Sequence, residues 1–372
     1  MAKPPKNAGV SAAKKNKHDE FYTQLTDIER ELRHYRSQFR GKTVLCNCDD
    51  PYESNFFKFF ALNFNELGIK KLIATSYGGS PIMGGYLPLL DIEGLKPDCK
   101  DPYAIEICEV PDHNGDGAID LTDVEYLLRH DANTSRTLKG DGTYSAGDFR
   151  SAECVDYLRQ ADVVVTNPPY WLFRDNIEQL AASEKKFLII GNKNSLDYRF
   201  VFKMIMQDKI WAGVRAFSGG MWFIADYAGK YEKIVDGVKL INVPAIWLTN
   251  MDNPKRHETI PLYKTYTPEE YPTYENYAAI EVGKVAEIPV DYDGLMGVPI
   301  TFLDKYSPGQ FEILGMCENL DLFGLKTRVY TTKECQDAYQ RLFGKKGTYD
   351  LNATAVLNGR KTYKRLLIKR KG

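Results

Sequence analysis

The sequence lacks the features of a membrane, secreted or zinc-binding protein. It has 372 residues and no apolar run approaching the roughly 18 residues of a membrane-spanning helix. Residues 1–17 also lack the apolar stretch of a secretory signal. The seven cysteines are scattered and odd in number, and neither they nor the five histidines show the spacing of zinc ligands. We therefore expect a reduced, cytoplasmic protein with no membrane partner.

The sequence also has almost no net charge, but its charges are unevenly placed. The formal net charge is −1. Residues 1–17 contain five lysines and no acid, and residues 360–372 contain seven basic residues and no acid. Residues 18–359 therefore carry 37 basic against 50 acidic side chains. Basic ends of this kind, including a flexible tail at 1–17, indicate either phosphate contacts or solubilising tails, and charge alone favours neither.

Short apolar runs alternate with helical segments over residues 18–252. Runs rich in β-branched residues predict buried strands at 43–48, 70–77, 104–110, 161–167, 185–192 and 244–250. Apolar residues at helical spacing predict helices at 20–39, 54–67 and 171–184. Strand, helix and strand in this order form a parallel βαβ crossover. We therefore expect an α/β fold with a doubly wound, Rossmann-like sheet.

The composition changes after Asn253. Tyrosines and prolines crowd residues 254–277, and no alternation of strands and helices is visible there. We therefore predict a second, smaller region over 253–372 with little regular structure and a basic C-terminus.

The segment with the most specific chemistry is Asn167-Pro168-Pro169-Tyr170, directly after an apolar run, at the end of a strand where open α/β folds bind ligands. An amino group on a base or an amide is a poor nucleophile because its lone pair is delocalised. The Asn167 side-chain oxygen and the Pro168 main-chain oxygen can accept both amino hydrogens, which stabilises a pyramidal nitrogen in the transition state. The prolines fix the turn, and the Tyr170 ring can stack on a flat substrate. The alternative interpretation is an ordinary Pro-Pro turn with an Asn cap.

Asn-Pro-Pro-Tyr after an apolar strand resembles motif IV of the S-adenosylmethionine-dependent amino methyltransferases. The segments CNCDDP (46–51), GDFRS (147–151), VVTNPPY (164–170), FLIIGNKN (187–194) and GVPITFLDKY (297–306) resemble the EcoRI-type adenine-specific DNA methyltransferases in particular. The resemblance covers residues 19–225 and extends more loosely to about 315. It implies a methyltransferase domain over 18–252 and a target-recognition region over 253–372.

The resemblance also implies which residues bind the cofactor S-adenosylmethionine. Residues 20–23 resemble motif X, residues 44–51 stand at the position of motif I, and residues 147–149 resemble motif III, whose Asp commonly hydrogen-bonds the cofactor adenine. Motif I departs from the usual pattern because it lacks a Gly-x-Gly turn, and the second strand ends without a carboxylate for the ribose. The implied cofactor-binding residues are Tyr22, Thr23, Asn47, Asp49, Asp50, Asp148 and Phe149.

The activity implied by the resemblance is methylation of adenine N6 in double-stranded DNA, within a restriction–modification system or by an orphan enzyme. Its catalytic residues are Asn167, Pro168, Pro169 and Tyr170, acting on an adenine flipped out of the duplex. We expect a monomer, with a cognate restriction endonuclease as a further partner. The same lone-pair chemistry would serve an RNA adenine or a protein glutamine. A calcium-dependent binding module on an inactive scaffold is the other alternative, against which the intact Asn167 and Tyr170 argue.

A second motif, at residues 112–123, matches a twelve-residue calcium loop inside an insertion over about 98–135. Oxygen donors stand at loop positions 1, 3, 5, 9 and 12, and the turn glycine stands at position 6. Position 12 is Asp, as in dockerins, where an EF-hand has Glu. We expect a structural Ca²⁺, and the alternative is a solvated Asp/Gly turn. The expected ligands are Asp112, Asn114, Asp116, Ala118, Asp120 and Asp123.

Overall fold

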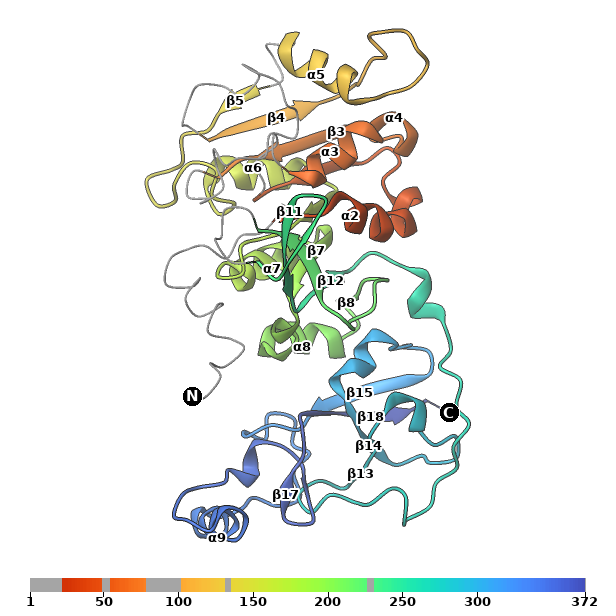
Figure 1. Ribbon diagram of the computed structural model, residues 1–372, viewed down its shortest axis with the longest axis vertical. Coiled ribbons are helices and arrows are strands. Elements are labelled where there is room, and N and C mark those ends of the chain that lie inside the picture. Colours follow the sequence, from red (N-terminus) through yellow and green to blue (C-terminus); the bar gives the residue numbers. More distant parts are fainter. Residues whose placement is uncertain (1–21, 49–53, 78–101, 131–134, 226–230, 372) are drawn as a thin grey trace. The chain divides into compact units, whose positions relative to one another are not determined.

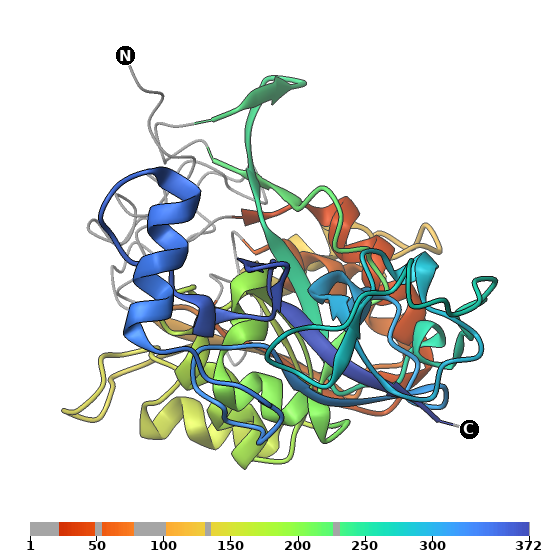
Figure 2. The same ribbon diagram turned by 90° about the horizontal axis from the view of Figure 1, so that it is seen from below.

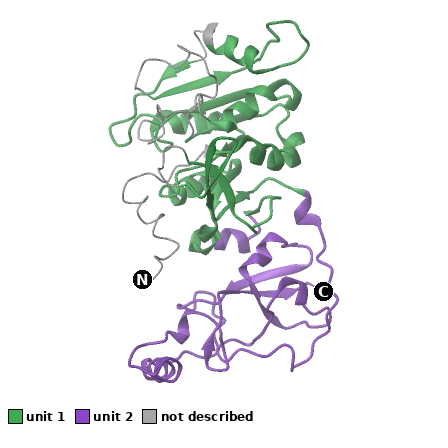
Figure 3. Ribbon diagram, in the orientation of Figure 1, with its two compact units in different colours: residues 1–201, 210–253 green, residues 202–209, 254–372 purple. Residues whose placement is uncertain are grey.

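The computed structural model describes residues 22–48, 54–77, 102–130, 135–225 and 231–371 (Figure 1). The chain divides into two compact units, one of residues 1–201 and 210–253 and one of residues 202–209 and 254–372 (Figure 3). The tail expected at 1–17 lies outside the described residues. Among the described residues, no helix is both long enough and apolar enough to cross a membrane.

The first unit is built on an eight-stranded sheet whose centre is parallel. Strands β3, β2, β6 and β7 are neighbours in that order and pair in parallel. The strands outside them pair antiparallel, so the expected doubly wound sheet is parallel only in its middle. In spatial order the strands are β5 (Ser135–Thr137), β4 (Tyr103–Ile107), β3 (Lys71–Thr75), β2 (Thr43–Cys46), β6 (Val163–Thr166), β7 (Lys186–Asn192), β12 (Ala245–Thr249) and β8 (Trp211–Ala212).

Helices flank this sheet, and their ends follow from local sequence (Figure 1). Ser54 accepts a hydrogen bond from the Phe56 amide at 3.1 Å and so caps the helix that follows β2. Gly68, at a φ of 63°, ends the next helix in the left-handed conformation that glycine adopts without strain. The helices of this unit are α2 (Leu25–Leu32), η1 (Arg33–Gln38), α3 (Asn55–Leu62), α4 (Phe64–Leu67), α5 (Leu121–His130), α6 (Ala152–Gln160), α7 (Phe173–Ala182) and η2 (Lys193–Asp197), and α8 (Arg199–Met206) leads into the second unit.

A small antiparallel sheet of four strands also belongs to the first unit. The expectation of helix from residue 20 is wrong at Tyr22 and Thr23, because these residues pair with Ile224 and Phe223 of a neighbouring strand. The helix begins only at Leu25. The hairpin of β10 and β11 in this sheet appears green in Figure 2. The strands, in spatial order, are β1 (Tyr22–Thr23), β9 (Met221–Ile224), β11 (Val238–Val243) and β10 (Lys233–Val235).

Glu31 fixes the helix that follows β1 to a distant loop. Its buried carboxylate accepts hydrogen bonds from the main-chain amides of Val214 at 2.6 Å and Arg215 at 2.8 Å. It also accepts from the Tyr35 hydroxyl at 3.0 Å. One turn earlier, Asp27 forms an ion pair with the Arg215 side chain. Burial, together with the neighbouring Glu31 carboxylate, raises the pKa of Tyr35, so this tyrosine remains a donor.

The second unit contains more regular structure than the sequence predicts. The expectation of little regular structure after Asn253 is wrong, because the unit holds a four-stranded sheet and a helix with a complete capping box, drawn blue in Figure 2. Tyr274 and Tyr277 are buried in its core. The strands are β13 (Ala279–Glu281), β14 (Leu295–Pro299), β18 (Arg365–Arg370), β15 (Phe311–Met316) and the pair β16 (Val356–Leu357) and β17 (Arg360–Lys361), and the helices are η3 (Pro254–His257), η4 (Val285–Glu287), η5 (Ile300–Asp304), α9 (Thr332–Phe343) and η6 (Leu351–Ala353).

The substitution Glu31→Gln is expected to lower the free energy of unfolding by about 2–4 kcal/mol. The amide cannot satisfy two main-chain donors and the Tyr35 hydroxyl as the carboxylate does. Urea unfolding followed by circular dichroism measures the effect. Glu29→Gln, an exposed position on the same helix, is the matched control and should change stability by less than about 0.5 kcal/mol. Equal effects of the two substitutions would contradict this role of Glu31.

Candidate active site

The carboxyl ends of three neighbouring parallel strands form the candidate site. In the register of the sheet, Cys46 of β2 lies beside Ala74 of β3, and Leu45 lies beside Val164 of β6. The residues that follow these strands therefore emerge at one edge of the sheet. At this edge the Thr166 hydroxyl of β6 donates a hydrogen bond to the Asn47 carbonyl oxygen after β2.

A small pocket at this edge is lined by segments that are far apart in the sequence. It brings together the end of β2, the end of β3, the predicted motif III and the turn after β6. Its lining residues are Cys48, Tyr77, Gly147, Asp148, Phe149, Pro169 and Leu172. The structure therefore places predicted cofactor residues and predicted catalytic residues around the same space.

The Asn-Pro-Pro-Tyr segment forms the turn between β6 and α7. Asn167 is half-buried, Pro168 and Pro169 are buried, and Tyr170 packs against the hydrophobic core. The Leu172 amide donates a hydrogen bond to the Pro169 carbonyl oxygen at 2.9 Å, which closes the turn just before α7 begins at Phe173. The turn is thus held at both ends by regular structure.

Gly147 brings the predicted motif III against the end of β3. Its φ is +76°, in the left-handed region. A β-carbon at this position would overlap the main-chain oxygen of Ser76, directly after β3. Only glycine permits this approach, so Gly147 fixes where Asp148 and Phe149 enter the pocket.

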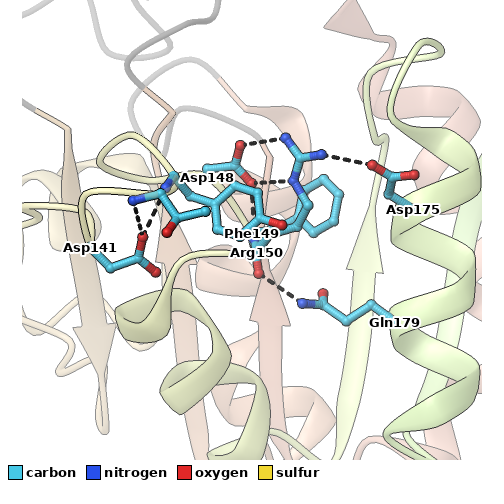
Figure 4. Close-up of polar contacts among 8 residues, drawn as sticks. Asp141, Asp148, Phe149, Arg150, Asp175 and Gln179 are labelled. Carbon is cyan, nitrogen blue, oxygen red and sulfur yellow. Dashed lines mark hydrogen bonds and ion pairs between the residues drawn. The ribbon is translucent and has the colours of Figure 1, made fainter.

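Asp148 is buried at the pocket and is bound by an arginine (Figure 4). Its Oδ1 accepts hydrogen bonds from the Arg150 main-chain amide at 2.9 Å and from the Arg150 Nε at 3.0 Å. Its Oδ2 accepts from an Arg150 terminal nitrogen at 2.8 Å. Hydrogen bonding to Asp148 raises the pKa of the Arg150 guanidinium, which stays charged. The carboxylate is therefore held in one orientation.

Two further predicted cofactor residues, which do not line this pocket, present buried polar atoms. The Asn47 side-chain oxygen and the Thr23 hydroxyl are buried and have no hydrogen-bond partner within the described part of the chain. Buried polar atoms of this kind are normally satisfied, so both suit a polar ligand such as the amino-acid or ribose part of S-adenosylmethionine. Tyr22 lies in β1 beside Thr23. Asp49 and Asp50 lie outside the described residues.

Cys48 accounts for the missing Gly-x-Gly turn of motif I. Its φ is +73°, the left-handed conformation that a glycine would adopt more easily. The chain therefore makes a glycine-like turn at the end of β2 with a cysteine, and this residue lines the pocket. Cys48 is thus the one residue of this segment that the structure shows in a conformation typical of glycine.

The predicted calcium loop is closed by hydrogen bonds of its own. Asp112 accepts from the amides of Gly115 and Gly117, at 2.7 and 2.8 Å. Asp123 is buried and accepts from the amides of His113 and Asp120, at 2.8 and 2.9 Å, and the hydrogen bond from Asp120 lowers its pKa most. Asn114, Asp116 and Asp120 accept main-chain amides two residues ahead. Over residues 102–130 and the other described ranges, no three His, Cys, Asp or Glu side chains are grouped to hold a metal ion.

Sequence reasoning missed the residues that support the predicted ones. Arg150, Asp175 and Gln179 surround Asp148 and Phe149, and Tyr77 lines the pocket after β3, where the family pattern usually has a carboxylate. The only feature of the sequence that pointed to Arg150 was its position two residues after Asp148, which allows an ion pair between the two. It did not reveal the contact with Asp175, because that residue lies 25 positions away in the sequence.

Comparison with known proteins decides the family. Residues 9–371 match the family model described as "Adenine-specific methyltransferase EcoRI". The chain belongs to this family. It is 43% identical over 331 residues to the type II methyltransferase M.EcoRI of Escherichia coli, and the alignment covers 86% of this chain and 93% of that protein. It is 35% identical to the type II methyltransferase M.MpnI of Mycoplasma pneumoniae, over 86% of this chain and 89% of that protein. No solved structure matches the chain.

Family membership confirms several expectations from the sequence. The protein is an adenine-specific DNA methyltransferase that uses S-adenosylmethionine, and its fold is the α/β fold of such enzymes. The resemblance read from the motifs therefore holds over nearly the whole chain, including the second unit. The roles of individual site residues remain predictions.

Gly147→Ala is expected to lower the free energy of unfolding by about 3 kcal/mol or more and to weaken cofactor binding. The methyl group would collide with the main chain after β3 at a positive φ. Gly142→Ala is the matched control, because Gly142 has a φ of +79° but open space around its α-carbon, and should cost only about 1 kcal/mol. Urea unfolding and calorimetry with S-adenosylhomocysteine distinguish the two. Similar losses in both variants would contradict the close approach.

Proposed function

We propose that the methyltransferase transfers the methyl group of S-adenosylmethionine to N6 of an adenine flipped out of double-stranded DNA at a specific site. The observation that carries this proposal is the position of Asn167 to Tyr170, in a turn beside the pocket lined by Asp148 and Phe149. A base inside the duplex cannot reach a pocket at a sheet edge, so the adenine must leave the stack.

The proposed chemistry depends on two oxygen acceptors. The Asn167 side-chain oxygen and the Pro168 carbonyl oxygen accept the two hydrogens of the adenine amino group. Their geometry favours a tetrahedral nitrogen, whose lone pair then points toward the methyl group. This interaction strengthens as positive charge develops on the nitrogen, so it lowers the transition state more than the ground state. The Tyr170 ring would hold the base by stacking.

The proposed cofactor site uses the polar groups that the chain presents at the same edge. S-adenosylmethionine supplies a methyl group activated by its sulfonium charge. Asp148 would accept a hydrogen bond from the cofactor's adenine amino group, and Phe149 would contact the base. Asn47 and Thr23, whose side-chain oxygens are buried, would bind polar parts of the cofactor. Tyr22, Asp49 and Asp50 are assigned to this site by motif position alone.

The second unit is the proposed region of DNA contact. Arg360, Lys361 and Tyr363 are exposed near the β16–β17 pair, and the Tyr363 side chain is 87% exposed. Basic side chains would contact phosphates, and an exposed ring suits contact with bases or sugars. Arg365 is excluded from this role because it pairs with Glu281.

We propose a cytoplasmic monomer whose further partner is a cognate restriction endonuclease.

Asn167→Ala is expected to reduce kcat for DNA methylation by about 10²–10³-fold, because one acceptor of the amino hydrogens is lost. Cofactor affinity should be retained, since the proposed cofactor contacts are elsewhere. Transfer of a tritiated methyl group to duplex DNA measures kcat, and calorimetry measures cofactor affinity. Unchanged methyl transfer in Asn167→Ala would overturn the catalytic assignment.

Two substitutions of Tyr170 test the proposed stacking. Tyr170→Phe keeps the ring and should retain activity within a few fold. Tyr170→Ala removes it and should cost about 1–3 kcal/mol of transition-state stabilisation. Steady-state methylation of duplex DNA separates the two variants. If Phe and Ala were equally impaired, the hydroxyl rather than the ring would carry the role of Tyr170.

We also propose that the loop of residues 112–123 binds a structural Ca²⁺. The support is the pattern of oxygen donors in Asp112, Asn114, Asp116, Asp120 and Asp123 with the main-chain oxygen of Ala118. The turns that these side chains make with loop amides give a compact loop followed by α5. Binding would require the carboxylates to turn toward the ion.

Calcium is expected to raise the melting temperature of the wild-type protein, because an ion that binds only the folded state adds about 2.7 kcal/mol at 100 times its Kd. Asp112→Ala should abolish the shift. Glu109→Ala, an exposed acid just outside the loop, should leave it intact. Calorimetry that detects no Ca²⁺ binding to the wild-type protein would remove the proposal.

A further inference from the structure

Arg150 joins the proposed cofactor site to the helix that follows the catalytic turn. The fork of its guanidinium binds Asp148, as described above, and its other terminal nitrogen donates to the Asp175 carboxylate at 2.7 Å. Figure 4 shows the guanidinium between the two carboxylates. Asp175 lies in the first turn of α7, whereas Asp148 lies in the loop before α6. One side chain thus connects the loop before α6 with the first turn of α7, which are separated in the sequence by α6 and β6.

Aromatic rings hold the guanidinium in this position. Its central carbon lies 4.7 Å from the centre of the Tyr144 ring and 5.5 Å from the centre of the Phe149 ring. Arginine stacks on aromatic faces through cation–π attraction. The Arg150 side chain is 25% exposed and Asp148 is buried, so the ion pair between them is shielded from water, whereas the Asp175 side chain is 48% exposed. Arg150 therefore has a fixed position, unlike a solvated surface arginine.

A second contact joins the same two segments. The Gln179 side chain, one turn after Asp175 on α7, donates a hydrogen bond from Nε2 to the Phe149 carbonyl oxygen at 3.0 Å. At its N-terminal end, next to Asp175, α7 follows the turn that Leu172 and Pro169 close. A displacement of residues 148–150 would therefore also displace α7 and the turn that contains Asn167.

The hydrogen bonds to Asp148 leave a defined acceptor. A carboxylate offers about four lone-pair positions. Arg150 occupies both positions on Oδ1, through its amide and its Nε, and one on Oδ2. Among the residues that the structure describes no other group donates to this carboxylate, so one position on Oδ2 remains, and its direction is set by the fork. Such an acceptor selects a donor, which the amino group of adenine is and the keto oxygen of hypoxanthine is not.

We propose that Arg150 is a positioning residue that orients Asp148 toward the adenine amino group of the cofactor and, through Asp175, fixes α7 and the catalytic turn. This rests on the proposed function in one respect, the assignment of Asp148 to the cofactor adenine. The arginine does not touch the reacting atoms. It makes both base selectivity toward the cofactor and the placement of Asn167 depend on one side chain.

The first test compares how strongly the protein selects adenine over hypoxanthine in the cofactor. The probes are S-adenosylhomocysteine and S-inosylhomocysteine, titrated calorimetrically into the full chain without DNA. The wild-type protein should bind the adenosyl compound more tightly. In Arg150→Met this selectivity should fall about tenfold, the equivalent of one charge-assisted hydrogen bond, through loss of adenosyl affinity. Arg150→Lys should resemble Arg150→Met, because an ammonium cannot form the fork.

Arg159→Met is the matched control for this test. Arg159 also pairs with an aspartate, Asp156, but both side chains are largely exposed on α6. The Arg159→Met variant should prefer the adenosyl compound over the inosyl compound as strongly as the wild-type protein does. If Arg150→Met lost affinity for both compounds equally, the arginine would only support the fold and the proposal would fail. A wild-type protein without selectivity would remove the assignment of Asp148 as well, whereas the catalytic role of Asn167 would stand.

The second test breaks the link to α7 and leaves the fork on Asp148 in place. Asp175→Ala, which removes the acceptor of the Arg150 hydrogen bond, should keep adenosyl selectivity within about twofold of the wild-type value, because Arg150 still binds Asp148. It should lower kcat for methyl transfer several-fold at saturating cofactor, with little change in the KM for cofactor, because the catalytic turn is less well fixed. Unchanged kcat in Asp175→Ala would overturn the proposed link to the turn.

Discussion

The parallel pairing of β2 with β3 and β6 is the constraint on which the site depends. Because the three strands run in the same direction, the segments after them leave the sheet at one edge. The hydrogen bond from the Thr166 hydroxyl to the Asn47 carbonyl oxygen fixes two of these ends to each other. Cys48 and Pro169 thus line the same pocket although about 120 residues separate them.

The loop at 147–150 turns this common edge into a binding site. Gly147 allows the loop to lie against the end of β3, and Asp148 is held by the arginine two residues later. The pocket therefore has a fixed carboxylate next to Phe149 and Pro169. Rigid support of this kind is what precise positioning of two reactants requires.

Much of this arrangement can be predicted from the sequence, for definite physical reasons. Apolar runs such as 161–166 are strands because a strand buried on both faces needs no polar alternation. The helix expected from residue 20 failed at Tyr22 and Thr23 because pairing with β9 overrides local helical spacing. The sheet of the second unit was missed because β14 and β18 lie about 70 residues apart and pair non-locally. Arg150 was missed because its partner Asp175 is distant in the sequence.

The most direct test of the account is the identity of the methylated product. Duplex DNA, RNA and a glutamine-containing protein substrate are each incubated with the protein and S-adenosylmethionine, and the hydrolysed products are separated by liquid chromatography with mass spectrometry. The account predicts N6-methyladenine in duplex DNA, with sequencing of the methylated DNA showing it at one recognition sequence. A methyl group found in RNA adenine or protein glutamine, with none on DNA adenine, would contradict it.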